Sequence, residues 1–169
     1  VAAAALGMAA FATAAQSAEL GSTLEEIVAG AKEEGKLVVW SNFPSKPETH
    51  SALIDAFNER FGLETELEWV PISSPQANSR AISEAAGRQV TVDIIGAGSI
   101  GEVKVAHEGE IIAPYDWVGV FGEEFPQIGE ADGPAEFEGL ALAYFVAHSV
   151  MGWHPDMISG EEVPNSWFE

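Results

Sequence analysis

The feature that most constrains the fold of this chain is the alternation of short apolar runs with stretches whose apolar residues recur at helical spacing. The apolar runs cover residues 36–40, 63–69 and 90–95, and the helical stretches cover residues 24–34, 53–61, 81–86 and 99–108. Strands that alternate with helices form an α/β layer with a mainly parallel sheet, because each helix carries the chain back to start the next strand. We therefore predict an α/β fold with helices flanking the sheet.

Local signals place the ends of these elements. Ser22-Thr23-Leu24-Glu25 has the form of a capping box before the first helix, and Gly35, Gly62 and Gly87 follow the first three helices. We predict a polar loop over residues 72–76, which leads into the third helix. Residues 96–99 form the loop after the third strand.

The strands differ in their patterning. Residues 36–40 are almost entirely apolar, which predicts a strand covered on both faces. In residues 63–69, glutamates alternate with apolar residues, which predicts one solvated face and a position near the edge of the sheet. Residues 115–139 show no periodicity and are predicted to form an extended surface segment.

The amino-terminal stretch, residues 1–18, carries no charge, is dominated by alanine and finishes in small residues. This layout predicts an export signal without its basic start, so that the mature protein begins near Glu19. A buried or membrane-spanning helix is the alternative, although the stretch is short for a span. Because the chain starts at Val1 and stops just after Trp167-Phe168, we expect that it is cut at both ends.

Composition excludes several classes of partner and site. There are 27 acidic residues against 7 Lys and Arg, a net charge of -20, which repels nucleic acid and anionic lipid surfaces. We therefore expect no nucleic-acid partner. The absence of cysteine excludes disulfides and thiolate metal sites, and the histidines at positions 50, 107, 148 and 154 are too scattered for a recognisable zinc spacing. We expect these histidines at the surface or in turns.

Several segments, in this order and spacing, resemble family 1 extracellular solute-binding proteins, especially the branch often described as ferric-iron binding. The segments are Leu37-Val38-Val39-Trp40-Ser41, Phe57-Asn58-Glu59-Arg60-Phe61-Gly62, Val92-Asp93-Ile94-Ile95, His107 to Tyr115, Gly152-Trp153-His154-Pro155-Asp156 and Val163-Pro164-Asn165-Ser166-Trp167. The resemblance covers essentially the whole chain after the export signal. No single segment is decisive, but their order together is fairly specific.

The resemblance implies a two-lobed periplasmic-binding-protein-like fold of type II, with the solute in a cleft between lobes that close by hinge motion. On this reading residues 1–18 are the export signal, 19–145 the first lobe, and 146–169 the crossover and start of the second lobe. The protein is then expected to be periplasmic or otherwise extracytoplasmic, monomeric, and without enzymatic activity or a cofactor. Its partners are expected to be a small-molecule or ion ligand and the membrane subunits of an ABC permease.

The candidate ligand-binding residues lie in the loops that follow the three predicted strands. Ligands in parallel sheets bind beyond the carboxyl ends of the strands, where small polar residues and helix starts offer hydrogen-bond donors. Each serine alone has the alternative role of capping a helix or filling a turn. A tyrosine near the predicted hinge is expected to border the same cleft, although it also fits a partly buried core position. The candidates are Ser41, Asn42, Ser73, Ser74, Gly98, Ser99 and Tyr144.

The identity of the ligand stays open at the level of sequence. Ferric binders of this family use a His or an acidic residue of the first lobe and a pair of tyrosines of the second. Here residues 41–44 contain no His, and Gly98-Ser99 stands where an acidic residue is wanted. An organic solute, an anion and ferric iron therefore remain as alternatives.

A different class of function is suggested by Gly96-Ala97-Gly98-Ser99-Ile100-Gly101, which has the G-x-G-x-x-G pattern of dinucleotide-binding loops. The pattern follows a predicted strand and precedes a predicted helix, as an NAD-dependent oxidoreductase requires. Two strand-helix units precede the pattern, however. The sequence after it also lacks the second strand ending in an Asp or Glu about 20 residues further on, which a dinucleotide-binding fold has there. The oxidoreductase is therefore kept as the alternative function.

Overall fold

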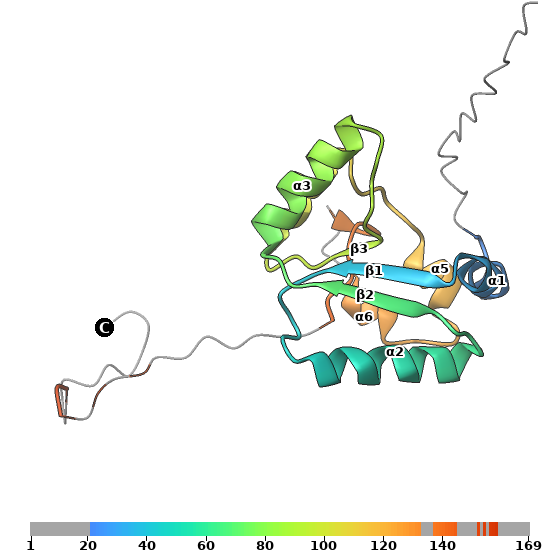
Figure 1. Ribbon diagram of the computed structural model, residues 1–169, viewed down its shortest axis with the longest axis horizontal. Coiled ribbons are helices and arrows are strands. Elements are labelled where there is room, and N and C mark those ends of the chain that lie inside the picture. Colours follow the sequence, from blue (N-terminus) through green and yellow to red (C-terminus); the bar gives the residue numbers. More distant parts are fainter. Residues whose placement is uncertain (1–20, 133–136, 145–151, 153, 155, 159–169) are drawn as a thin grey trace, which may run out of the picture.

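The computed structural model describes residues 21–132, 137–144, 152, 154 and 156–158 (Figure 1). The predicted export signal at residues 1–18 and most of the predicted crossover at residues 146–169 lie outside the described residues.

A small sheet of three parallel strands, in the order β2-β1-β3, organises the described part of the chain (Figure 1). The strands are β1 (Lys36–Trp40), β2 (Glu66–Val70) and β3 (Ile94–Ile95). The apolar strand β1 lies at the centre, and the alternating strand β2 lies at an edge with Glu66 and Glu68 exposed. The predicted α/β class, the parallel sheet and the edge position of β2 are thereby confirmed.

Helices flank this sheet. In Figure 1, α2 lies on one side of the strands and α3 on the other, while α1 lies beside the start of β1. Helix α3 also packs against α4. The helices are α1 (Leu24–Glu34), α2 (Pro47–Phe61), α3 (Ser74–Ala86), α4 (Ile100–Glu108), α5 (Trp117–Phe121) and α6 (Ile128–Ala131). No helix in the described ranges combines the length and apolarity of a membrane span.

The ends of α1 and α2 follow from local sequence. Gly35 and Gly62 end these helices with φ of 65° and 64°, a left-handed conformation that favours glycine. The cap of α1 lies one residue later than predicted: Thr23 accepts a hydrogen bond from the Glu26 amide, and Glu26 reaches back to Ser22. The S/T-x-x-E pattern occurs in two overlapping frames here, and the frame beginning at Thr23 is the one that forms.

The core lies where α3 packs on the sheet. Trp40 is 1% exposed, and it is contacted by Ala77 and Ala81 of α3, which are both fully buried. These small side chains pack in one cluster with the Trp40 ring, and the Arg80 guanidinium lies 3.9 Å from the centre of that ring. The cation-π contact joins the helix to the same core residue.

Other sequence predictions also need correction. The second strand, predicted over residues 63–69, covers Glu66–Val70. The third strand covers only Ile94–Ile95 instead of residues 90–95, because the Val38 amide that would continue the β1–β3 ladder donates instead to the Asp93 carboxylate, at 2.7 Å. The loop predicted over residues 72–76 ends earlier, since α3 already begins at Ser74.

The predicted extended segment at residues 115–139 contains the short helices α5 and α6. Contacts of aromatic residues hold this segment in place, although its sequence has no periodic pattern of apolar residues. Phe125 contacts Phe61 of α2 edge-on, and the Arg60 guanidinium lies 4.6 Å from the Phe125 ring while it pairs with Glu124 at 2.9 Å.

Candidate ligand-binding site at the carboxyl ends of the strands

The three strands end at one level of the sheet. Trp40 at the end of β1 is paired with Val70 of β2 and with Ile95 of β3. Beyond this level, the Ser41 amide donates to the Val70 carbonyl and the Gly96 amide donates to the Trp40 carbonyl. The loops that follow therefore leave from the same edge, which we call the strand-end rim (residues 41–46, 71–74 and 96–99).

Ser41 lies at the base of the rim. It is 5% exposed, and its hydroxyl donates to the Phe43 carbonyl at 2.7 Å and accepts from the Phe43 amide at 3.1 Å. The Trp69 indole donates to the Ser41 carbonyl at 2.8 Å. The hydrogen bonds of the Ser41 hydroxyl are therefore made to the backbone of its own loop, and they fix the turn through Asn42 and Phe43.

Asn42 and Phe43 form the exposed part of the first loop, and Tyr144 lies against Phe43. Asn42 is exposed, and residues Phe43 and Tyr144 are 47% and 57% exposed. The Tyr144 hydroxyl donates to the Phe43 carbonyl at 3.2 Å, and the two ring centres are 6.4 Å apart. The structure therefore brings Tyr144, which is 101 residues further along the chain, to the loop after β1.

Ser73 and Ser74 lie at the start of α3, and both are partly exposed. The Ser73 hydroxyl donates to the Gln76 side chain at 2.7 Å and makes no capping hydrogen bond. The Ser74 hydroxyl lies 3.8 Å from the position that a Cβ atom on Gly98 would take. The second and third loops are therefore neighbours on the rim.

Gly98 and Ser99 form the exposed third loop, and Ser99 caps α4 by accepting from the Glu102 amide. The Glu102 carboxylate reaches back over this loop and accepts from the Gly98 amide at 2.5 Å. Glu102 was not among the predicted site residues. The signal for it is the capping-box pattern Ser99-x-x-Glu102, which places an acidic side chain at the start of the helix.

Two further residues position the rim. Asn78 is 3% exposed, and its side-chain amide donates to the Glu102 carbonyl at 2.9 Å, so that it ties α3 to the first turn of α4. His50, predicted at the surface or in a turn, is half-buried in α2: its ring stacks on Trp69 at 4.0 Å and its Nε2 is bonded to the Pro44 carbonyl at 2.6 Å. This contact holds the end of the first loop against the sheet.

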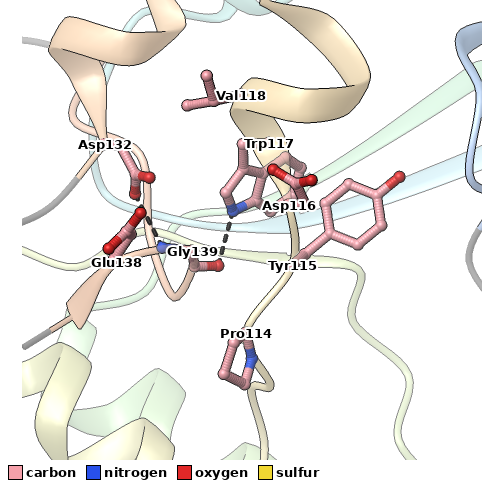
Figure 2. Close-up of a pocket in the computed structure, with 8 residues that line it drawn as sticks. All are labelled: Pro114, Tyr115, Asp116, Trp117, Val118, Asp132, Glu138 and Gly139. Carbon is pink, nitrogen blue, oxygen red and sulfur yellow. Dashed lines mark hydrogen bonds between the residues drawn. The ribbon is translucent and has the colours of Figure 1, made fainter. Parts of the chain in front are cut away.

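Two cavities of the described residues lie away from the rim. The one in Figure 2 has a volume of about 330 Å³ and lies between the segment before α5 and the segment around Gly139. The Trp117 indole donates to the Gly139 carbonyl at 2.7 Å, and the Gly139 amide donates to Asp132 at 2.9 Å. Burial raises the pKa of the Tyr115 hydroxyl in its wall.

The second cavity, of about 520 Å³, is lined by Gly35, Gly62 and their neighbours, which precede β1 and β2. It therefore lies at the opposite edge of the sheet from the rim. None of the seven predicted ligand residues lines either of these cavities. Asn42, Gly98 and Ser99 of the rim are exposed at the surface.

Within the described ranges, no three or more His, Asp or Glu side chains are grouped so that they could hold a metal ion. The glycine pattern at residues 96–101 begins directly after strand β3 and ends in the first turn of helix α4. No family model matches the chain, and no curated protein matches it either.

Proposed function

We propose that this protein is the extracytoplasmic solute-binding component of an ABC importer, and that the strand-end rim is the first-lobe half of its ligand site. The observation that carries the proposal is the meeting of three loops at one edge of a parallel sheet, joined by the contacts of Ser41 with Val70 and of Gly96 with Trp40. Parallel α/β sheets bind their ligands at this edge. The family resemblance and the signal-like residues 1–18 support the same class.

The exposed nature of the rim fits a site that two lobes share. Asn42, Ser74 and Ser99 offer hydrogen-bonding groups on a surface that a second lobe would have to cover. On this proposal residues 19–145 are a type II lobe, and the permease recognises the closed form. A solute that turns a mostly open population into a mostly closed one must favour closure by about 5 kcal/mol. Such a difference requires contacts from both lobes.

The alternative function, an NAD-dependent oxidoreductase, has less support. A dinucleotide fold places the pyrophosphate at the amides of the glycine loop and the following helix. Here the Gly98 amide is already bonded to the Glu102 carboxylate, whose negative charge would face the phosphates.

Native mass spectrometry of the protein, expressed from its complete coding sequence in its own host, tests the proposal. A retained small solute that is released by denaturation is expected. Adding that solute at a hundredfold excess over its Kd is expected to raise the free energy of unfolding by about 2.7 kcal/mol, without turnover. Retained NAD with its absorbance, or no bound solute under any growth condition, would contradict it.

A further inference from the structure

We propose that the second cavity, at the amino ends of β1 and β2, binds a small inorganic cation through oxygen atoms of the chain. The bound cation joins the ends of helices α1 and α2 to the start of strand β2. The cavity lies at the opposite edge of the sheet from the strand-end rim, so the inference does not depend on the proposed function.

Helices α1 and α2 both end at this cavity. Gly35, which caps α1, and Gly62, which caps α2, are part of its lining. The last carbonyl groups of a helix lack amide partners within that helix, and the helix dipole makes this end negative. A Cβ atom added to either glycine would meet no atom beyond its chain neighbours within 4 Å, so the space beside both helix ends is open. Proteins use carbonyl oxygens and the negative ends of helices to hold cations.

Thr65 supplies a buried oxygen without a partner. The residue is 8% exposed, it lines the same cavity, and its hydroxyl makes no hydrogen bond with the residues that the structure describes. Its backbone is fixed, because the Asn58 side chain accepts from the Thr65 amide and donates to the Thr65 carbonyl, both at 3.0 Å. A buried hydroxyl that stays unpaired is unfavourable, and a bound cation gives this oxygen a partner.

The charges around the cavity favour a cation over an anion. Lys32 and Glu64 line the wall with opposite formal charges, and neither forms an ion pair within the described ranges. These two charges cancel, and the two helix ends then contribute about −0.5 elementary charge each. The net charge of -20 on the whole chain raises the concentration of cations near its surface further.

The donor atoms indicate the class of cation. The cavity offers the Thr65 hydroxyl, the Glu64 carboxylate and backbone carbonyls, which are all oxygen donors. Hard cations such as Na⁺, K⁺ and Ca²⁺ bind to oxygen, whereas Zn²⁺ is bound mainly by nitrogen and sulfur. A site of this kind takes most of its donors from the backbone, and so it differs from the groups of His, Asp and Glu side chains that the described residues lack.

The experiment measures thermal unfolding of the protein, expressed from its complete coding sequence, in the chlorides of Na⁺, K⁺ and Ca²⁺. N-methyl-D-glucamine chloride at the same ionic strength is the reference, because it screens the charges of the chain but is too large for such a site. At least one of the three metal cations is expected to raise the melting temperature above the reference, with a saturating concentration dependence that gives a Kd. Hydrogen exchange in that cation is expected to slow at the amides of residues 35 and 62–66.

Variants assign the effect to the cavity. Thr65→Val removes the hydroxyl at nearly constant shape and is expected to raise the Kd about five- to tenfold, as the loss of one polar contact does. Thr65→Ser keeps the oxygen and is expected to have a Kd close to that of the parent protein. Glu64→Gln is expected to raise the Kd and Lys32→Gln to lower it, because they remove charges of opposite sign. The matched control is Glu48→Gln in the first turn of α2, which removes a charge at the other end of that helix and is expected to leave the Kd unchanged.

Melting temperatures in the reference salt show whether a variant is folded, and Thr65→Val is expected to match the parent protein there. If it melts lower, the exposed positions Glu64 and Lys32 carry the test, with opposite shifts in Kd as the supporting result. Equal melting temperatures in all four salts would overturn the inference. A cation effect that is the same in Thr65→Val, Glu64→Gln and the parent protein would overturn it too, because such an effect reports general binding to the acidic surface. Neither result bears on the strand-end rim, whose solute is tested by native mass spectrometry.

Discussion

Replacing Gly96 with alanine probes the contact that brings the third loop against the first. A Cβ atom at this position would lie 2.8 Å from the Ser41 Cβ and would collide with the Ser41 hydroxyl. Ser41 has little room to give way, because it is 5% exposed, its hydroxyl is bonded to the Phe43 backbone, and its carbonyl is bonded to the Trp69 indole. The added methyl must therefore push the two strand ends apart.

The size of the effect follows from two opposing terms. Forcing a methyl group into a packed site costs about 1–3 kcal/mol. An alanine restricts the unfolded chain and recovers about 0.4–1 kcal/mol, because the backbone at residue 96 is not in the left-handed region. The net loss in the free energy of unfolding is about 1–2 kcal/mol, which lowers the melting temperature by about 2–8 °C for a chain of this length.

Thermal and urea unfolding of the parent protein, Gly96→Ala, Ser41→Gly and the double variant measure this effect. Ser41→Gly removes both atoms that the new methyl meets, so the alanine is expected to cost less in that background, with a coupling of about 1 kcal/mol. A Gly96→Ala protein as stable as the parent, or an alanine penalty that is the same with Ser41→Gly, would refute the close approach of the two loops.

Three other predictions follow from single contacts. Thr65→Val is expected to leave the melting temperature unchanged or to raise it, because the buried Thr65 hydroxyl has no hydrogen-bond partner among the described residues. A loss above about 1 kcal/mol in urea unfolding would contradict this. Asn78→Ala is expected to cost about 1–3 kcal/mol in the same assay, because it removes the hydrogen bond from the buried Asn78 side chain to the Glu102 carbonyl. Asn78→Asp is expected not to restore this stability, since a carboxylate has no hydrogen to donate. The hydrogen bond from Thr91 holds the pKa of Glu84 below its ordinary 4.5. The stabilisation from ionised Glu84 is therefore present above pH 4.5 and is lost as pH falls through the lowered pKa. The difference in melting temperature between the parent protein and Glu84→Gln is expected to disappear at low pH, and a difference that persists at pH of about 2 would contradict this.

Most of the sheet and its main helices could be predicted from the sequence because their signals are local. The apolar run of β1, the alternating glutamates of β2 and the glycines at positions 35 and 62 each act within one element. The structure places β1 and the two glycines as predicted, and it keeps the alternation of β2 in a strand that begins at Glu66 instead of residue 63. The edge position of β2 also follows from its own pattern, since exposed glutamates are excluded from a strand covered on both faces.

The predictions that failed depend on contacts between distant residues. The third strand is shorter than its apolar run because a side chain, Asp93, takes the hydrogen bond of Val38. Helices α5 and α6 are held by aromatic contacts that have no period, such as that of Phe125 with Phe61. No sequence pattern reports pairs of this kind.

The candidate site shows the same division. Asn42, Ser74, Gly98 and Ser99 follow strands, and the parallel topology alone brings them to one edge. The polar groups that stay available at this edge depend on contacts between different loops. Gly96 packs against Ser41, and the Glu102 carboxylate accepts the Gly98 amide.

Hydrogen exchange of the protein with and without its retained solute tests the central claim most directly, because it locates binding without assuming the chemistry of the solute. We expect slower exchange at the amides of Asn42, Phe43, Gly98 and Ser99, with little change around Trp117 and the cavity of Figure 2. Protection confined to residues 114–118 and 137–140, with the strand-end rim exchanging as fast as before, would contradict the account.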